Sequence, residues 1–295
     1  MKFARRLFLL LSFLALAAEA QEIGKLTVLE GSLRLIRGVS LYSGSVGIPL
    51  EQGDILESSE AGFAQLEFPG GPIVALGPST RLYILQFAPA TAKTKAAHFV
   101  LLSGWLKAEP NSAAGTYRYD APLLGGTTGN GTFVLHVTHD DCDIYIESGP
   151  AMVGEISREG NLHQPQAGKT GDFFSRRASK SLTISSHWSP GFVDSMPRAF
   201  KDTLPPIIDK FKAKKIEMKP GTLVSYNDVH SWLTMPEAWR RGFVPRFRPR
   251  LSDREFHAQI EANLAEHFEW DKILHPEKYR PETPPVPAQN SDHPS

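Results

Sequence analysis

Residues 136 to 143 form the densest group of side chains in the chain that could bind a metal ion. Imidazole, carboxylate and thiolate groups are the usual ligands of zinc and other transition metals. The group consists of His136, His139, Asp140, Asp141, Cys142 and Asp143. Its spacing matches no established zinc signature, and its middle residues are typical of a hairpin turn. The sequence therefore favours a structural turn over a metal site, and we expect no metal or cofactor.

Arginines form the strongest charge cluster, which runs to Arg254 and is interleaved with Trp239, Phe243 and Phe247. Guanidinium groups pair with carboxylates or phosphates and stack on aromatic rings. We expect the following arginines to bind a partner: Arg240, Arg241, Arg246, Arg248 and Arg250. On this interpretation the arginines are exposed and replaceable without loss of the fold. The alternative is a solvated face, neutralised in part by nearby acidic residues, because charge runs are usually surface features.

Signatures of catalysis are missing from the sequence. The glycine-rich stretch from Gly125 to Thr132 lacks the Lys-Ser/Thr ending of a phosphate-binding loop, and no predicted helix follows it. It is interpreted as a flexible β connection. No nucleophile-elbow motif and no Ser, His and acid arrangement is recognisable. We therefore expect no catalytic residues and no enzymatic activity.

The N-terminus has the order of a cleavable export signal. Three basic residues precede an apolar run from Leu7 to Ala18, and Ala18-Glu19-Ala20 follows it. The run is shorter than the roughly 20 residues of a membrane-spanning helix. Residues 1–20 are thus predicted to be a signal peptide, and the mature protein is expected to begin at Gln21 and to work outside the cytoplasm.

Composition excludes several other classes of protein. Without residues 1–20, which contain three basic residues and one acidic residue, 29 basic and 31 acidic residues remain. A near-neutral chain is not built to coat nucleic acid or anionic membrane. Cys142 is the only cysteine, so no intrachain disulfide can form, and we expect its thiol to be buried.

Residues 21–180 have the pattern of a β domain. Short runs of alternating apolar residues are separated by glycine, proline and polar residues, which is typical of strands and turns. Such runs begin near residues 25, 32, 63, 73, 81, 99, 132, 143 and 152. One shared core is expected to contain Leu66, Phe68, Leu76, Leu101 and Phe133.

Residues 189–279 have a different pattern, which predicts a helical subdomain. Apolar residues from Phe200 to Phe211 recur at three- and four-residue intervals, which favours an amphipathic helix interrupted at Pro205-Pro206. A second helix is predicted from Asp253 to Phe268, with a capping box of Ser252 and Glu255. The apolar stripe of this helix is expected to comprise Phe256, Ile260, Leu264 and Phe268, and to lie near Trp232 or Trp270. Residues 280–295 are proline-rich and polar, and we expect a disordered tail.

Three motifs, in a fixed order, carry a resemblance to a known family. They are Leu66–Leu82 with its Pro-Gly-Gly-Pro turn, Phe99–Leu106, and Tyr117–Val137 with its Gly-Thr-Phe-Val-Leu sequence. The region from about residue 61 to 137 thereby resembles the FecR domain, a periplasmic β module of bacterial envelope signalling proteins. Gly70 departs from the family pattern, which usually has Asp there, and residues 125–130 are looser than the family's strand.

The resemblance implies a mainly β fold, either a FecR-like β-sandwich or a short irregular β-coil, followed by the helical subdomain. It also implies a periplasmic protein that mediates protein interaction or signal reception in the cell envelope. Its partner is expected to be an envelope protein or a cell-wall polymer. Glycan or peptidoglycan binding is the alternative function. The family's cytoplasmic sigma-factor-binding region and membrane span are not recognisable in this sequence, and the sequence indicates no oligomeric state.

Overall fold

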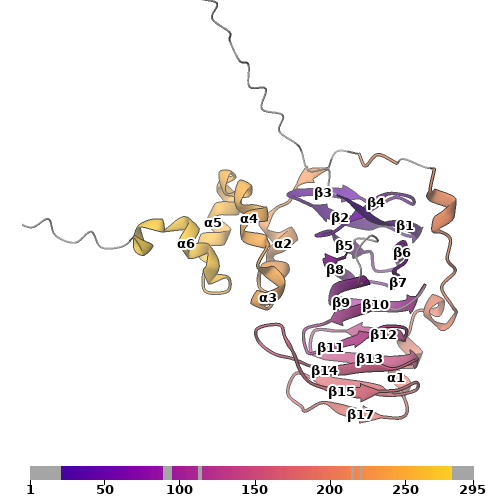
Figure 1. The fold of residues 1–295 in the computed structure, drawn as a ribbon. Coiled ribbons are helices and arrows are strands. Elements are labelled where there is room, and N and C mark those ends of the chain that lie inside the picture. The colour runs from indigo at the N-terminus through magenta and orange to yellow at the C-terminus, as the bar shows by residue number, and fades with distance from the viewer. Residues whose placement is uncertain (1–20, 89–94, 112–114, 214–215, 220, 281–295) are drawn as a thin grey trace, which may run out of the picture.

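The computed structural model describes residues 21–88, 95–111, 115–213, 216–219 and 221–280, and the predicted signal peptide and tail residues 281–295 lie outside these ranges. The strands form two β-sheets, and within each sheet they lie one above another along a common axis (Figure 1). Sheet A has the order β4 (Pro49–Glu51), β1 (Glu22–Glu30), β6 (Phe63–Glu67), β7 (Pro72–Leu76), β9 (Lys95–Pro110), β12 (Thr132–Val137), β13 (Asp141–Ser148), β16 (Phe173–Arg177) and β17 (Thr183–Ser185). Sheet B has the order β18 (Thr222–Leu223), β3 (Ser40–Ser43), β2 (Leu33–Arg37), β5 (Ile55–Ser58), β8 (Arg81–Phe87), β9, β10 (Gly115–Asp120), β11 (Leu124–Thr128), β14 (Ala151–Ile156) and β15 (Leu162–Gly168).

Strand β9 belongs to both sheets. Its first half pairs with β8 and β10 in sheet B, and its second half pairs with β7 and β12 in sheet A. The change of sheet occurs at Gly104, whose φ is 88° and where a Cβ would lie 2.5 Å from the Cα atom of Thr80. Only glycine accepts both this backbone conformation and this close approach. β9 therefore joins the two sheets into one unit.

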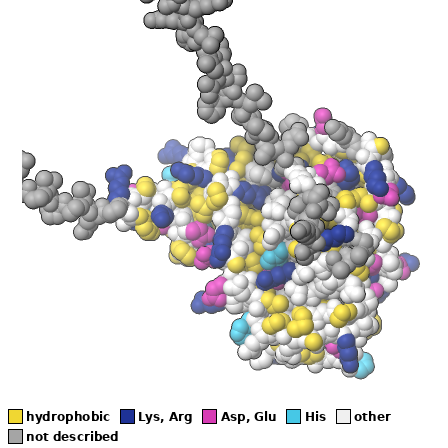
Figure 2. All heavy atoms as spheres, in the orientation of Figure 1, with side chains coloured by type: hydrophobic (Ala, Val, Ile, Leu, Met, Phe, Trp, Pro, Cys, Tyr) yellow, Lys and Arg dark blue, Asp and Glu magenta, His cyan; other side chains and the backbone are white. Residues whose placement is uncertain are grey.

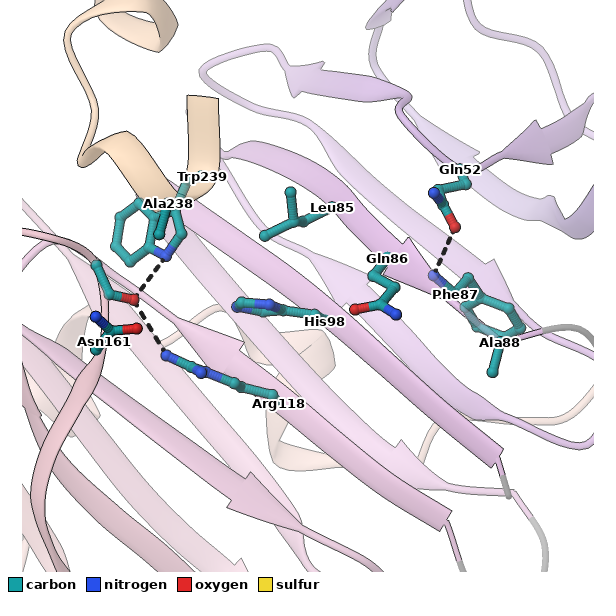
Figure 3. Close-up of a pocket in the computed structure, with 11 residues that line it drawn as sticks. Gln52, Leu85, Gln86, Phe87, Ala88, His98, Arg118, Asn161, Ala238 and Trp239 are labelled. Atoms are coloured by element: carbon teal, nitrogen blue, oxygen red, sulfur yellow. Dashed lines mark hydrogen bonds between the residues drawn. The ribbon is translucent and has the colours of Figure 1, made fainter. Parts of the chain in front are cut away.

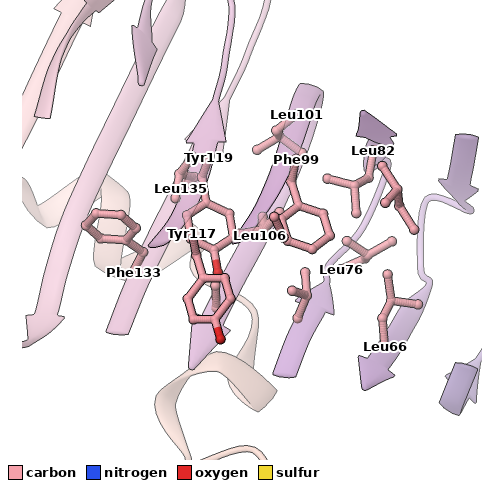
Figure 4. Close-up of a cluster of buried hydrophobic side chains, with 14 of the residues drawn as sticks. Leu66, Leu76, Leu82, Phe99, Leu101, Leu106, Tyr117, Tyr119, Phe133 and Leu135 are labelled. Atoms are coloured by element: carbon pink, nitrogen blue, oxygen red, sulfur yellow. The ribbon is translucent and has the colours of Figure 1, made fainter. Parts of the chain in front are cut away.

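The main core lies between the two sheets (Figure 4). Alternate residues of each strand point into it, as strand geometry requires. All five residues predicted for the shared core are buried there, which confirms that prediction. Cys142 is buried in the same core, as predicted, and burial raises the pKa of its thiol to about 12.

The outer face of sheet A is covered by the chain that follows β17 (Figure 1). This chain forms α1 (Pro190–Ser195), the 3-10 turn η1 (Arg198–Lys201) and the 3-10 turn η2 (Ile208–Phe211). We call residues 197–211 the strap. The amphipathic helix predicted from Phe200 to Phe211 is wrong, because residues 202–207 run without helical structure. Proline disfavours helical backbone in the residue before it, and Pro205 and Pro206 lack the N–H groups that a helix needs.

The outer face of sheet B is covered by a cluster of helices, drawn at the left of Figure 1. We call residues 224–279 the helical cluster. It contains α2 (Tyr226–Leu233), α3 (Glu237–Arg240), α4 (Phe243–Phe247), η3 (Arg248–Ser252), α5 (Arg254–Ala262), η4 (Phe268–Trp270), α6 (Asp271–Leu274) and η5 (Pro276–Tyr279). Its core is rich in aromatic residues, and both Trp232 and Trp270 are fully buried in it.

Helix α5 is shorter than the predicted helix. Its N-cap is Asp253, whose carboxylate accepts hydrogen bonds from the backbone N–H groups of Glu255 and Phe256, so the predicted capping box with Ser252 is wrong. The helix ends at Ala262. Phe256 and Ile260 are buried as predicted, whereas Phe268 lies beyond the helix and is 61% exposed. The predicted stripe therefore holds only over the part that is helical, with Leu264 partly buried beside it.

The fold class predicted from the sequence is confirmed: the protein is mainly β, with a helical region near the C-terminus. No helix in the described ranges is both long and apolar enough to span a bilayer. The glycine-rich stretch differs from its interpretation as a flexible connection. Residues 124–128 form strand β11, which pairs with β10 and β14.

Candidate functional site

A cleft of about 610 Å³ opens on the outer face of sheet B, next to α3 (Figure 3). Its floor comes from β8, β9 and β10, and its walls come from α3 and from the turn between β14 and β15. The lining residues are Gln52, Leu85, Gln86, Phe87, Ala88, His98, Arg118, Gly160, Asn161, Ala238 and Trp239. The cleft thus lies where the helical cluster leaves part of sheet B uncovered.

A buried carboxylate organises the floor of the cleft. Asp120 is fully buried, and its Oδ2 atom lies 2.7 Å from Nε2 of His98 and 2.7 Å from Nη2 of Arg118. Arg118 Nε also donates a 3.0 Å hydrogen bond to Oδ1. A buried charge requires partners of this kind. Asp120 therefore fixes the imidazole and the guanidinium in defined positions at the cleft.

Strand geometry brings these three side chains together. Arg118 and Asp120 are two residues apart on β10 and so point to the same face. β10 runs parallel to β9, and in this register Arg118 is opposite His98. On the other side Asp120 is opposite Gly125 of β11, where a Cβ would lie 2.4 Å from Oδ1 of Asp120. Glycine at position 125 therefore makes room for the carboxylate.

The walls of the cleft are tied to its floor through Gly160. Its carbonyl oxygen accepts hydrogen bonds from Arg118 Nη2 and from Trp239 Nε1, each at 3.2 Å (Figure 3). Gly160 has a φ of 86°, and a Cβ there would lie 3.0 Å from Trp239 Nε1. The β14–β15 turn, sheet B and α3 are thus held in one arrangement around the cleft.

Several polar groups of the cleft keep free hydrogen-bonding capacity. Within the described residues, the side-chain amides of Gln86 and Asn161 have no partner, and His98 Nδ1 has none either. Both amides are on exposed residues. The described lining contains no hydroxyl, thiol or amine side chain that could act as a nucleophile. The arrangement is therefore equipped to bind a ligand through hydrogen bonds.

Other hollows include two of several hundred cubic ångströms. An apolar one of about 300 Å³ lies on the outer face of sheet A, where Tyr145, Trp188 and Met196 contribute to its lining. Another, of about 680 Å³, lies between β3 and residues 216–222, a stretch that is only partly described. The cleft on sheet B is the better candidate site, because it combines two side chains fixed by a buried carboxylate with amides that have no partner among the described residues.

The fold separates Cys142 from the other residues first considered for a metal site. Cys142 points into the core, whereas the ring of His136 stacks on Trp105 on the outer face of sheet A, with centroids 3.8 Å apart. Asp143 accepts hydrogen bonds from Ser175 and Arg177. In the described ranges no three His, Cys, Asp or Glu residues are placed to hold a metal ion.

Three of the five predicted partner-binding arginines point inward. Arg240 Nη1 donates to the carbonyl oxygens of Leu233 and Glu266, and Arg250 Nε donates to that of Val224. Arg246 donates to the carbonyl oxygens of Ile36, Gly38 and Gly53, at 2.9, 2.8 and 2.6 Å. The expectation that the cluster is exposed is therefore wrong for these three residues, which tie the helical cluster together and to sheet B.

The remaining two arginines, Arg241 and Arg248, are exposed. On the face that Figure 2 shows, the basic side chains of the helical part are dispersed among acidic and hydrophobic ones. Partner binding through Arg241 and Arg248 stays a prediction.

Sequence reasoning missed His98, Arg118 and Asp120. One signal was present: Arg118 and Asp120 are of opposite charge and two residues apart in an alternating run, which places them on one face of a strand. The contribution of His98 depends on the parallel pairing of β9 with β10. No local pattern specifies that pairing.

Comparisons with known proteins give little further guidance. No family model and no curated protein matches the chain. Two crystal structures of a candidate anti-sigma factor from Parabacteroides distasonis ATCC 8503 are similar to part of it, with TM-scores of 0.37 and 0.35 and 9% sequence identity. The similarity covers 45% of this chain and 59% of that protein. At this level it carries no argument about function.

Proposed function

We propose that this chain is a non-catalytic, FecR-like protein of the bacterial cell envelope that mediates interaction or signal reception in the periplasm. The FecR-like motifs and the order of the first 20 residues support this assignment. The observation that carries the binding role is the cleft on sheet B. There, a buried carboxylate fixes two polar side chains at the edge of an open hollow.

The composition of the cleft supports binding over nucleophilic catalysis. Covalent catalysis needs a nucleophile within hydrogen-bond reach of a base. His98 is oriented by Asp120 and could serve as a base, but the described lining offers no Ser, Thr, Cys or Lys side chain beside it. Amide and guanidinium groups in a concave surface are instead suited to recognition.

Export is tested by the N-terminus of the protein isolated from fractionated cells. We expect periplasmic protein that begins at Gln21, because Ala18 and Ala20 suit signal peptidase cleavage. Full-length protein that remains in the cytoplasm would contradict the proposed location.

The binding role is tested by crosslinking intact cells and recovering the protein with its partners. Gln86→Trp should block the cleft, because residue 86 is exposed and lines it. The matched control is Asn130→Trp, at an exposed amide outside the lining. We expect the first variant to lose a crosslinked partner that wild type and the control both retain. The same products from all three proteins would reject the cleft as the binding surface.

Glycan or peptidoglycan binding is the second candidate function. It is favoured by the free amides of Gln86 and Asn161, since amide groups both donate and accept hydrogen bonds. Co-sedimentation of the purified protein with wall sacculi separates the two candidates. Sedimentation that Gln86→Trp abolishes supports glycan binding, whereas a crosslinked protein partner without sedimentation supports protein interaction.

A further inference from the structure

We propose that the cleft on sheet B binds a short, uncharged, hydroxyl-rich saccharide, with Gln86, Asn161 and His98 as direct contacts and Arg118 as a positioning residue. This inference rests on the proposed role of the cleft as the receiving surface. It names the chemical class of the ligand and the groups that recognise it.

The charges of the cleft argue against an anionic ligand. Arg118 is the only Lys or Arg in the described lining, and both its Nε and Nη2 atoms are engaged by Asp120. The opposite charges of this pair cancel at the cleft. A site built for phosphate or for a polyanion concentrates unpaired positive charge. An uncharged ligand therefore fits the electrostatics of this cleft better.

The cleft offers more to a small polar ligand than to the aromatic anchor of a protein interface. The centres of protein interfaces are enriched in exposed aromatic anchors and depleted in charged residues. Here the indole of Trp239 is 1% exposed and its N–H donates to Gly160, so it offers little surface to a partner. The most exposed polar groups are the amides of Gln86 and Asn161, which lie beside the partly exposed Leu85, Phe87 and Ala88.

The free groups match the chemistry of sugars. Each side-chain amide has two N–H donors and an acceptor oxygen, and an imidazole supplies one more donor or acceptor. Hydroxyl groups pair with all of these. Because Asp120 holds His98 and Arg118, and Gly160 holds the wall, little side-chain freedom at the floor remains to be lost on binding. A volume of about 610 Å³ accommodates a ligand of a few sugar rings.

The proposal is tested by calorimetric titration of the purified mature chain with two probes, the tetramer of N-acetylglucosamine and maltotetraose. We expect at least one of them to bind wild type. The double variant Gln86→Ala/Asn161→Ala should weaken that binding by about tenfold or more, since about 1.4 kcal/mol is a factor of ten in affinity. The control Asn130→Ala should bind as wild type does, and thermal melts establish that all variants are folded.

A third probe, polyglutamate, separates the classes of ligand. No binding of either saccharide, or binding of polyglutamate that depends on Gln86 and Asn161, would overturn the proposal. A different outcome is that Gln86→Trp loses a crosslinked protein partner while neither saccharide binds wild type. That result would reject the saccharide as the ligand but keep the cleft as the receiving surface. Equal saccharide binding by wild type and the double variant would place the ligand elsewhere and reject this site.

Discussion

The outer faces of the two sheets are covered in different ways by the C-terminal third of the chain. On sheet A, charged and polar side chains of the strands bind the backbone of the strap through hydrogen bonds. On sheet B, aromatic side chains of the helical cluster pack against apolar strand residues, in a cluster that includes Ile36, Ile55, Tyr83 and Val100. The first cover adds a row of paired polar groups to a small apolar cluster, and the second depends mainly on buried aromatic area.

The hydrogen bonds to the strap come from a polar row on sheet A. Lys107 Nζ donates to the carbonyl oxygens of Phe200 and Asp202, at 2.8 and 3.0 Å. Glu109 accepts from the N–H of Leu204. Glu67 in the same way accepts from the N–H groups of Ile207 and Ile208. These side chains replace the backbone partners that residues 202–207 lack as a non-helical segment.

This difference accounts for the position of the cleft. The strap crosses the strands of sheet A from β9 to β6 and contacts them through its backbone and through the side chains of Phe200 and Leu204. The helical cluster contacts sheet B through compact groups of large side chains such as Trp232 and Phe243. Beyond these groups the floor around His98 and Arg118 stays open. The comparison predicts different consequences when each cover is disrupted.

The largest effect is expected on the aromatic cover. Trp232 is fully buried, lies edge-on to Tyr83 and donates to Glu57, so Trp232→Ala should lower the free energy of unfolding by about 4 kcal/mol. The control is Trp188→Ala on the side of sheet A. That indole is 45% exposed, and its loss should cost under about 1 kcal/mol. Equal losses in urea titrations would show that the aromatic packing is not what holds the helical cluster.

The polar cover should fail when its central cation is removed. Lys107 is fully buried, and its amino group also pairs with Glu109 and Glu147 at 3.0 and 2.8 Å. Lys107→Met leaves two carboxylates without their cation and should cost about 3 kcal/mol. Amide exchange at Leu204 and Ile207 should accelerate, with little change in the helical cluster. The exposed Lys201→Met is the control, and unchanged exchange in Lys107→Met would contradict the account.

A smaller effect is expected where a guanidinium joins the helical cluster to sheet B. Arg246 reaches three backbone carbonyl oxygens, a geometry that the single amino group of lysine cannot reproduce. Arg246→Lys should lower the free energy of unfolding by about 2 kcal/mol. The exposed Arg248→Lys should leave it unchanged. If Arg246→Lys were as stable as wild type, the three hydrogen bonds of Arg246 would not stabilise the fold, and the residue would behave like an exposed arginine.

The smallest expected effect is a pH dependence of the helical cluster. Burial lowers the pKa of His267 below its ordinary value of 6.5, and Arg240 and His230 lower it further while Glu266 raises it. The unfolded chain therefore binds the proton more readily than the folded one. The contribution of His267 is complete above a pH of about 6.5 and is lost as the pH falls from there towards the folded-state pKa.

The test compares urea midpoints at a pH of about 7.5 and about 5.5. Wild type should lose more stability on acidification than His267→Gln does. His139→Gln serves as the control. The His139 side chain is 98% exposed, so this variant should lose as much stability on acidification as wild type does. An identical loss in all three proteins would assign the acid sensitivity to other groups.

Much of the β domain could be predicted because its strands follow a local rule. In Ala64–Phe68 the alternation of apolar and polar residues specifies which side chains enter the core, and Leu66 and Phe68 are indeed buried. Gln65 and Glu67 are buried as well, although the alternation places them on the outer face. Their burial depends on the strap, which lies about 140 residues further along the chain, so no local pattern reveals it.

The helical region and the site were less predictable, for the same physical reason. The periodicity of residues 200–211 is that of a helix, but Pro205, Pro206 and the polar row of sheet A stabilise a different backbone. The roles of Arg240, Arg246 and Arg250 are set by carbonyl oxygens from distant segments. Likewise His98 and Asp120 meet only through a parallel strand pair. Contacts between distant segments decide each of these cases.

The central claim is that the open part of sheet B, and not the covered sheet A, receives the ligand or partner. Site-specific photo-crosslinking in intact cells tests it most directly, with a photoreactive amino acid placed at position 86 in the cleft, at position 130 on the β11–β12 turn, or at position 201 in the strap. We predict a discrete crosslinked product from position 86 and none from positions 130 and 201. A product from position 201 with none from position 86 would contradict the account.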